Sequence, residues 1–465
     1  MIESTGNKQV IGAELAVSAL LSSLVRRNVC PNFVTTRGVF TCQYEPPSKL
    51  WGCEDNKRPM GGQYSAPRRR PKLPAEPGST HRGRYQYMRM ELCSEGDAEE
   101  YLKRQPNTLV STEVAVGIVF QVAFALYVAA EKFHMKHYDM KLLNIFLQSV
   151  TASSDGGGAT VLRYGVGSSI FALRLAGNDA LIAKVADYGT AVTTASSNGA
   201  PATIGQFTTL ENTPPEFLIL GDAAKQGHGH DAFGLGLCMF HLFTGNAPYE
   251  EILEDVVCPP NLKKELEAIW TGSSSTGYDV IQSVILADVD YDDDGTIIEG
   301  EPDGTLYDTL YRFLVLFGIP ERDFGTKDSA RVWNAIRSCL EGKTNSNSGT
   351  NNSNNSNTIT KTGKGRSRKK VKNDKTQFHR DRNVYSLDEG SNQYVKRARE
   401  RLRSVDGAWE ALRSLIDFNP DNRTTAIGLL NSRMMQGFSE DHDAEYSQND
   451  SVMSFMAYHS TQGQS

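Results

Sequence analysis

Two short polar strings in the middle of the chain combine residue types that suit the transfer of a phosphoryl group. The first has the form H-x-D-x-K-x-x-N at residues 137–144, and the second, D-Y-G, begins at Asp187. A carboxylate such as Asp139 can accept the proton of an attacking hydroxyl, and an ammonium such as Lys141 can neutralise charge on the transferred group. Oxygen atoms from Asn144 and Asp187 suit a hard cation such as Mg²⁺. The spacing of 43 residues between these last two predicts one site to which both strings contribute.

Three more strings follow in the same order along the chain. They are N-T-P-P-E at 212–216, D-A-F-G-L-G at 231–236 and P-D-N-R-T-T at 420–425. With the first two strings, they resemble the catalytic loop, the metal-binding loop and the late C-lobe motifs of eukaryotic-type protein kinases. The resemblance covers about 85 to 250, plus 406–435. It implies an α+β fold, protein-kinase-like and two-lobed, with an abbreviated N-lobe and a mainly helical C-lobe.

The same resemblance implies that residues before and after the first string (137–144, the catalytic string) form a nucleotide site. Met90 stands at the gatekeeper position, and Glu91 and Cys93 would offer hinge backbone groups to adenine. Asp97 would meet the ribose, and Phe146 would form the floor of the adenine pocket. ATP and Mg²⁺ are therefore the expected cofactors, and proteins the expected substrates.

Other family positions bear on regulation and on the acceptor. Thr209 stands where Ser/Thr kinases use a threonine to bridge the base and the lysine, and Lys141 itself favours Ser/Thr over Tyr acceptors. Glu216 and Arg423 are expected to form a bidentate, structural ion pair. Tyr138 replaces an arginine that gathers activation-segment phosphate in many kinases. We therefore expect that phosphorylation of this segment is not the main switch.

The upstream part departs from the family pattern. No G-x-G-x-x-G occurs before residue 30, and no V-A-I-K string is present. About ten residues precede the first expected helix, too few for the three strands that cover ATP in a complete kinase. Glu14 is the candidate ion-pair glutamate of that helix, with a solvated surface residue as an equal alternative, and Lys8 is a weak choice of partner. The chain is either an incomplete version of an active kinase, which the four intact site residues favour, or a non-catalytic kinase-like scaffold without an ATP lid.

Composition sets outer limits on the class of protein. The chain has 465 residues, a formal net charge of −6 and a pI near 5.9, which argues against a nucleic-acid partner. Its seven cysteines form no C-x-x-C pair, and the N-terminus has no signal-peptide pattern, so a cytoplasmic or nuclear location is expected. Val114 to Ala130 is apolar apart from Gln121, and we interpret it as a buried helix rather than a membrane span.

Two further strings each have one interpretation without a function and one with a function. Residues 290–301 fit the calcium loop of an EF-hand, but Pro302 follows at once and no second loop pairs with it. An acidic exposed insertion is the favoured interpretation, and Ca²⁺ binding is the lesser one. The basic run at 364–372 is equally consistent with a nuclear import signal and with a solvated charge run.

Patterning and composition divide the chain into successive segments. Expected helices include 11–29 and 231–244, and expected strands include 33–40 and 85–92. The segments are a partial N-lobe at 1–92 with a Pro/Arg-rich insertion at 45–84, a C-lobe core at 93–250, C-lobe helices with an acidic insertion at 251–342, a disordered Asn/Ser-rich and basic linker at 343–393, terminal C-lobe helices at 394–435 and a loose tail at 436–465.

Overall fold

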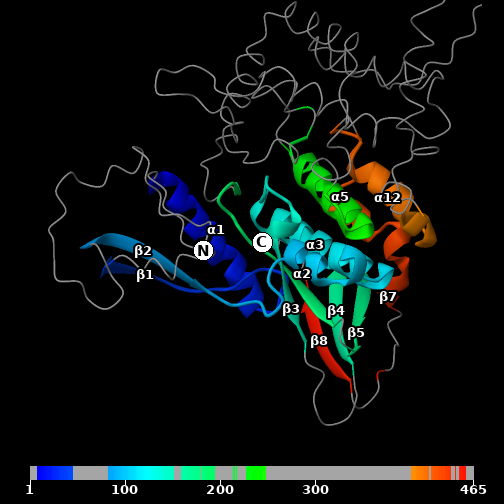
Figure 1. Ribbon diagram of the computed structural model, residues 1–465, viewed down its shortest axis with the longest axis horizontal. Helices are drawn as coiled ribbons and strands as arrows, with labels where there is room; N and C mark the ends of the chain where they lie inside the picture. The colour runs from blue at the N-terminus through cyan, green and yellow to red at the C-terminus, as the bar shows by residue number, and fades with distance from the viewer. Residues whose placement is uncertain are drawn as a thin grey trace, which may run out of the picture.

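Figure 1 shows the computed structural model of the chain, in which two helix-and-sheet parts meet around one long central helix. The structure describes residues 8–44, 82–150, 159–177, 180–193, 213–214, 216, 227–247, 400–417, 420–440, 446 and 450–456. Several predictions fall outside these residues. They concern Thr209, the C-lobe helices expected within 251–342, the calcium-like loop at 290–301 and the basic run at 364–372.

The N-terminal part consists of one helix beside a two-stranded antiparallel sheet. Helix α1 (Lys8–Arg26) buries Val17, Leu21 and Leu24, which recur at helical spacing. Strands β1 (Thr36–Tyr44) and β2 (Arg82–Met90) pair antiparallel, and they lie beside α1 in Figure 1. The helix was predicted three residues late at each end. The strand predicted at 33–40 is wrong at its start, because residues 32–34 pair instead with Val185 at the end of strand β6 (Leu181–Val185).

Helix α3 (Thr112–Phe133) forms the centre of the molecule. Ser111 caps its first turn by accepting a hydrogen bond from the Val114 amide, and His134, in the left-handed conformation at φ 49°, ends it. Every residue from Ala115 to Ala129 is buried. In the described part of the chain it is the one helix long and apolar enough to cross a membrane, but 83% of that apolar window is buried inside the protein. A buried core helix passes the same test, so this is weak evidence for a span.

A second group of elements carries the two polar strings. Helix α2 (Ala98–Arg104) follows β2, and a 3₁₀ turn (Leu142–Asn144) leads into strand β3 (Ile145–Ser149). Strand β3 pairs antiparallel with β6 (Leu181–Val185), from Ile145 opposite Val185 to Ser149 opposite Leu181. Both strings therefore lie at the same end of this ladder, because Asn144 precedes β3 and Asp187 follows β6.

The helical layer packs closely on the catalytic string. Helices α5 (Gly229–Thr244), α12 (Ala408–Leu415) and α13 (Ala426–Leu430) belong to this layer, and α5 and α12 lie on one side of α3 in Figure 1. The helix predicted at 231–244 is confirmed within two residues. Gly234 and Gly236 leave room for neighbouring side chains. A Cβ added at Gly234 would lie 2.8 Å from the Cβ of Met140, and one added at Gly236 would lie 2.4 Å from a methyl carbon of Ile416.

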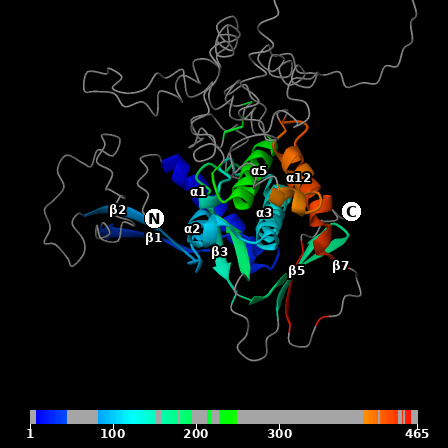
Figure 2. The ribbon, with the colours of Figure 1, turned by 45° about the vertical axis from the view of Figure 1, so that its right-hand side comes forward.

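A four-stranded sheet lies on the other side of α3, as Figures 1 and 2 both show. It is formed by β4 (Thr160–Val166), β5 (Ser169–Leu175), β7 (Ser439–Glu440) and β8 (Ser451–Met456), in the order β7-β5-β4-β8. The hairpin β4–β5 is an insertion between the two polar strings that the sequence patterns did not reveal. The expectation of a loose tail at 436–465 is wrong for β7 and β8, because both strands pair with this hairpin.

Candidate active site

One buried carboxylate on α5 binds the backbone of the catalytic string, residues 137–144. The side chain of Asp231 accepts hydrogen bonds from the backbone amides of His137 and Tyr138, both at 2.8 Å. Burial raises the pKa of Asp231, and the nearby His137 and the two amide hydrogen bonds oppose that rise. Tyr138 has φ 65°, so these bonds help to hold a backbone conformation that a non-glycine residue seldom adopts.

Tyr138 does not supply a cation to the site. Its ring is 3% exposed and packs edge-on against His230 of α5, with ring centroids 5.1 Å apart. Burial raises its pKa further above the ordinary value of 10, so the phenol stays neutral at physiological pH. The position where many kinases carry an arginine is therefore part of the apolar support of the loop.

The three predicted site residues of the first string lie together. The Nζ of Lys141 lies 3.0 Å from Oδ2 of Asp139, and Nδ2 of Asn144 lies 2.9 Å from the same oxygen. Nδ2 of Asn144 also donates to the backbone carbonyl of Asp139 at 2.7 Å. Asp139 and Asn144 are both buried, whereas the side chain of Lys141 is 21% exposed. The carboxylate is thereby oriented by two donors on one oxygen.

Asp187 follows β6 at the end of the β3–β6 ladder where Asn144 precedes β3. Its side chain is exposed and its backbone is in the left-handed conformation at φ 60°. The Gly189 amide donates to its Oδ1 at 3.3 Å, and the neighbouring Ala186 amide donates to the carbonyl of Asn144 at 2.9 Å. The second bond brings the backbone just before Asp187 against the backbone of Asn144, so the two predicted metal ligands stand on adjacent loops.

Tyr188 fastens the D-Y-G string to the protein interior. Its side chain is buried, its hydroxyl donates to the Val185 carbonyl at 2.6 Å, and its ring meets His137 edge-on at 5.9 Å between centroids. Burial raises its pKa well above 10. His137 in turn has its Nε2 3.0 Å from the Ala186 carbonyl, so the two strings are linked by both rings and backbone.

The donor atoms fit a hard divalent cation. Because Asn144 uses Nδ2 to reach two oxygens of Asp139, its amide oxygen is the atom left to bind a ligand. Amide and carboxylate oxygens from Asn144 and Asp187 are ligands of the kind that Mg²⁺ takes, with water and phosphate oxygens completing the shell. Among the described residues, no group of three His, Cys, Asp or Glu side chains could hold a metal ion by itself. A shared site of protein and phosphate oxygens is consistent with that observation.

Two of the predicted adenine-side residues, Cys93 and Phe146, meet after β2. Cys93 and Ala186 are buried together with Val34, and Phe146 packs against these three side chains. The structure therefore brings Cys93 and Phe146 together and joins them to the residue before Asp187. Met90 is 45% exposed at the end of β2. Burial and the negative charge of Glu91 raise the pKa of the Cys93 thiol to about 11, so it is neutral at physiological pH.

Asp97 has a structural role in addition to its predicted ribose contact. Its Oδ1 accepts a hydrogen bond from the Glu100 amide at 2.8 Å and so caps helix α2. It also forms an isolated antiparallel bridge with Phe146. Asp97 and Phe146 are therefore adjacent, as a shared nucleotide site requires, and the ribose contact remains a prediction.

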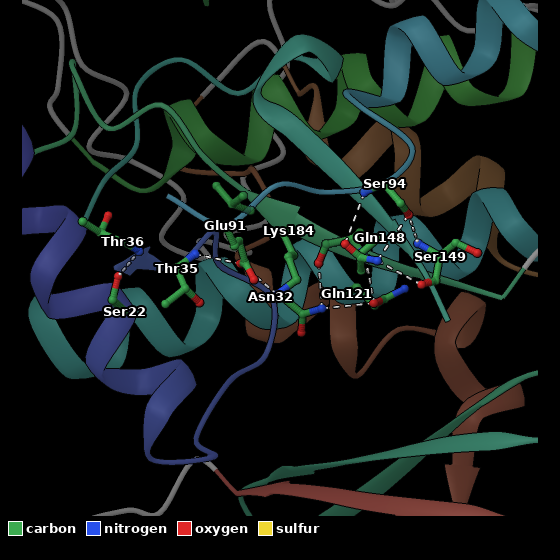
Figure 3. A network of polar contacts seen from close by, with 12 residues as sticks. Ser22, Asn32, Thr35, Thr36, Glu91, Ser94, Gln121, Gln148, Ser149 and Lys184 are labelled. Atoms are coloured by element: carbon green, nitrogen blue, oxygen red, sulfur yellow. Dashed lines mark hydrogen bonds and ion pairs between the residues drawn. The ribbon is translucent and has the colours of Figure 1, made fainter. Parts of the chain in front are cut away.

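An ion pair that sequence reasoning missed joins the hinge to β6. Lys184 Nζ lies 2.9 Å from Oε1 of Glu91, and the Thr35 amide donates to the same oxygen at 2.7 Å (Figure 3). The side chains of Lys184 and Glu91 are 10% and 18% exposed. The predicted hinge residue Glu91 thus keeps its carboxylate turned inward. The only signals of this pair in the sequence were a lysine three residues before Asp187 and, 93 residues earlier, a glutamate at the predicted hinge.

A second buried polar group anchors the same strand to α3. Nδ2 of Asn32 donates to Oε1 of Gln121 at 3.0 Å and to the Ala183 carbonyl at 2.8 Å. The amide of Ala183 also donates to Gln121, and Nε2 of Gln121 donates to the Leu181 carbonyl at 3.1 Å. Figure 3 shows Asn32 and Gln121 near the pair of Lys184 and Glu91. Gln121, the one polar residue in the apolar run of α3, therefore holds the strand that leads to Asp187.

The expected ion pair behind the site is present. The two guanidinium nitrogens of Arg423 each lie 2.6 Å from an oxygen of Glu216, and both side chains are buried. Arg423 also lies over the ring of Phe233 and donates to the carbonyls of Gly229 and Asp417. The prediction of a bidentate, structural pair is thereby confirmed. Glu14 lies half-buried on α1, and its role as an ion-pair glutamate stays a prediction; Lys8 begins the same helix rather than a strand.

The described residues thus form an α+β arrangement with an acid, a lysine and an asparagine on one loop and an aspartate on the next. Residues 77–290 match the family model described as Protein kinase domain. This stretch therefore carries a protein-kinase-type domain, as the sequence motifs predicted. No curated protein matches the chain.

Proposed function

We propose that this chain is a protein kinase that transfers the γ-phosphate of ATP to serine or threonine hydroxyls of protein substrates. The observation that carries the proposal is the group formed by Asp139, Lys141 and Asn144, next to the loop of Asp187. A fold that only binds partners has no chemical need for all four residues in this arrangement. The expected setting is cytoplasmic or nuclear, without a nucleic-acid partner or a membrane span.

In this proposal each residue has its own role. When bound, ATP would supply the phosphoryl group and Mg²⁺ would neutralise much of its charge. The amide oxygen of Asn144 and the carboxylate of Asp187 would hold the metal. Asp139 orients the acceptor hydroxyl and takes its proton, while Lys141, whose Nζ lies beside that carboxylate, can turn toward the transferred phosphate. The D-x-K-x-x-N form, with lysine at 141, favours a Ser/Thr acceptor by resemblance.

The second candidate is a non-catalytic kinase-like scaffold. One observation favours it: in the described part of the N-terminal lobe, β1 and β2 form a sheet of two strands, and Phe40 and Tyr87 stack on it with Phe40 54% exposed. A scaffold would present such surfaces to partners and would bind Mg²⁺-ATP weakly or not at all. Nucleotide binding therefore separates the two functions.

The test is Mg²⁺-ATP binding and phosphate transfer to a mixed serine/threonine peptide library. The full chain is compared with Asp139→Asn, Asp187→Asn and the matched control Asp406→Asn, which makes the same chemical change at a surface residue paired with Arg433. We expect transfer by the full chain and by the control, loss of transfer in both site variants, and loss of metal-dependent nucleotide binding in Asp187→Asn alone. No transfer together with weak or absent Mg²⁺-ATP binding would favour the scaffold.

A further inference from the structure

The C-terminal segment is built into the sheet that interrupts the kinase-type domain. Strand β8 runs parallel to β4, from Ser451 opposite Thr160 to Met456 opposite Gly165, and β7 pairs with β5 on the other edge. Residues 439–456 lie outside the matched range 77–290, whereas the hairpin β4–β5 lies inside it. The chain therefore returns from its far end to complete a sheet in the middle of its catalytic domain.

Two carboxylates of this segment are bound to arginines of the hairpin. Asp450, whose side chain is 1% exposed, lies 2.9 Å and 3.1 Å from the two terminal nitrogens of Arg174 and accepts the Ala159 amide at 2.9 Å. Glu440, 5% exposed, lies 2.8 Å from Nε of Arg163. A buried carboxylate with several donors is costly to leave unpaired, so these contacts fix the segment in one register.

Apolar packing ties the same strands to α3. Phe455 of β8 packs on Tyr164 of β4, with ring centroids 5.8 Å apart, and Tyr164 meets Phe124 and Phe120 of α3 at 4.7 Å and 5.2 Å. Gly165 faces Met456 so closely that an added Cβ would lie 2.4 Å from its sulfur. The position of β8 is thus determined by side chains as well as by backbone pairing.

The hairpin is continuous in the chain with both metal-ligand strands. Strand β3 leads from Asn144 outward to the hairpin, and β6 returns from it to Asp187. The ladder between them closes at its outer end with the Val150 amide on the Ala180 carbonyl at 2.8 Å. The ladder is five residue pairs long, about 17 Å. The hairpin is thus joined by the chain to the outer end of the two strands that lead to Asn144 and Asp187.

We propose that residues 439–456 are a positioning segment of the active site: by completing the inserted sheet, they hold β3 and β6 so that Asn144 and Asp187 face one metal ion. Asp450 is the main positioning residue, because it bonds both the start of β4 and, through Arg174, the end of β5. The inference rests on the proposed function for its catalytic consequence, but not for the coupling of the segment to the ladder.

The test compares chains that end at residue 438 and at residue 456. The longer version keeps β7 and β8 and is the matched control. We expect the shorter chain to need more Mg²⁺ for half-maximal transfer and to show kcat lower by about tenfold to a hundredfold, because small misplacements of catalytic groups have effects of this size. A synthetic peptide of residues 439–456, added to the shorter chain, is expected to restore both quantities. Unchanged Mg²⁺ dependence in a folded shorter chain would overturn the proposal.

Point variants test the same proposal if the shorter chain does not fold. Asp450→Asn retains an oxygen for the Ala159 amide but loses the charge that Arg174 binds, and Gly165→Ala pushes on Met456. Both are expected to raise the Mg²⁺ requirement, with Asp406→Asn as the unaffected control.

Hydrogen exchange supplies a readout that does not depend on activity. The amides of β3 and β6 should exchange faster in the shorter chain and in Asp450→Asn than in the full chain. If the full chain transfers no phosphate yet these amides respond, the proposed function fails and the coupling stands. If transfer is normal and the amides do not respond, the positioning role fails alone.

Discussion

Lys184 and Glu91, 93 residues apart in the chain, form an ion pair of 2.9 Å between β6 and the hinge. The Thr35 amide reaches the same carboxylate oxygen, so three segments meet at one atom. The pair is mostly shielded from water, and removal of one partner leaves the other charge without compensation. It is therefore expected to stabilise the hinge against the strand that leads to the active site.

Lys184→Met is expected to lower the free energy of unfolding by about 2 kcal/mol, below the cost of breaking a fully buried pair because Glu91 keeps some contact with water. Urea unfolding gives the value. The matched control is Lys103→Met, which removes an exposed pair with Glu99 and should cost less than about 0.5 kcal/mol. Equal costs for the two variants would show that the hinge pair does not stabilise the fold.

Arg423→Lys is expected to destabilise the protein by about 3 kcal/mol, because lysine cannot reproduce the two parallel bonds to the buried Glu216. Thermal unfolding followed by circular dichroism measures the loss. Arg433→Lys, at a surface pair with Asp406, should leave the transition in place. A melting temperature equal to that of the unchanged protein would contradict a structural role for Arg423.

Asp139→Asn is expected to lower kcat by about 10²–10⁴-fold with little change in the KM for ATP, since the amide cannot take the proton of the acceptor hydroxyl. Asn144→Ala should instead raise the Mg²⁺ concentration for half-maximal transfer, because it removes a metal-binding oxygen. Steady-state kinetics over a range of Mg²⁺ concentrations distinguishes the two. If both variants changed the same parameter, the division of roles proposed for the loop would be wrong.

Stability should fall on the acid side of neutrality because of His230. Burial lowers the pKa of its imidazole well below 6.5, and the charge of Arg423 lowers it further. Below about pH 6.5 the unfolded chain binds a proton that the folded chain does not, so the free energy of unfolding decreases as the pH falls, by at most about 1.4 kcal/mol per pH unit.

His230→Phe is the variant that checks this pH dependence. It keeps a ring against Tyr138 and removes the titrating group, so its free energy of unfolding should change less between pH 7 and pH 5, as measured in urea at each pH. Asp231, whose pKa is raised, acts in the opposite direction above its ordinary value of 3.8, but it is present in both proteins and cancels in the comparison. Parallel pH profiles would exclude His230 as the source.

Local motif spacing determined much of the site. The residue types at Asp139, Lys141, Asn144 and Asp187 predicted one phosphate-transfer centre, and the structure brings the catalytic string and the D-Y-G string together. The apolar run before them predicted the buried helix α3, and the family motifs predicted the pair of Glu216 and Arg423. These features are visible in sequence because they depend on short, ordered strings or on helical periodicity.

Which distant segments meet became visible in the folded protein alone. The strand at 451–456 is short and its residues are mostly exposed, so its own pattern indicates no sheet. It is held as a strand by contacts with distant residues: Asp450 pairs with Arg174, 276 residues away, and Phe455 packs on Tyr164. Lys184 likewise pairs with Glu91 only after β6 packs beside the hinge. The chemical groups and their local order can be read from the chain alone. How those groups are held depends on long-range pairing, and that pairing depends on the packing of the whole domain.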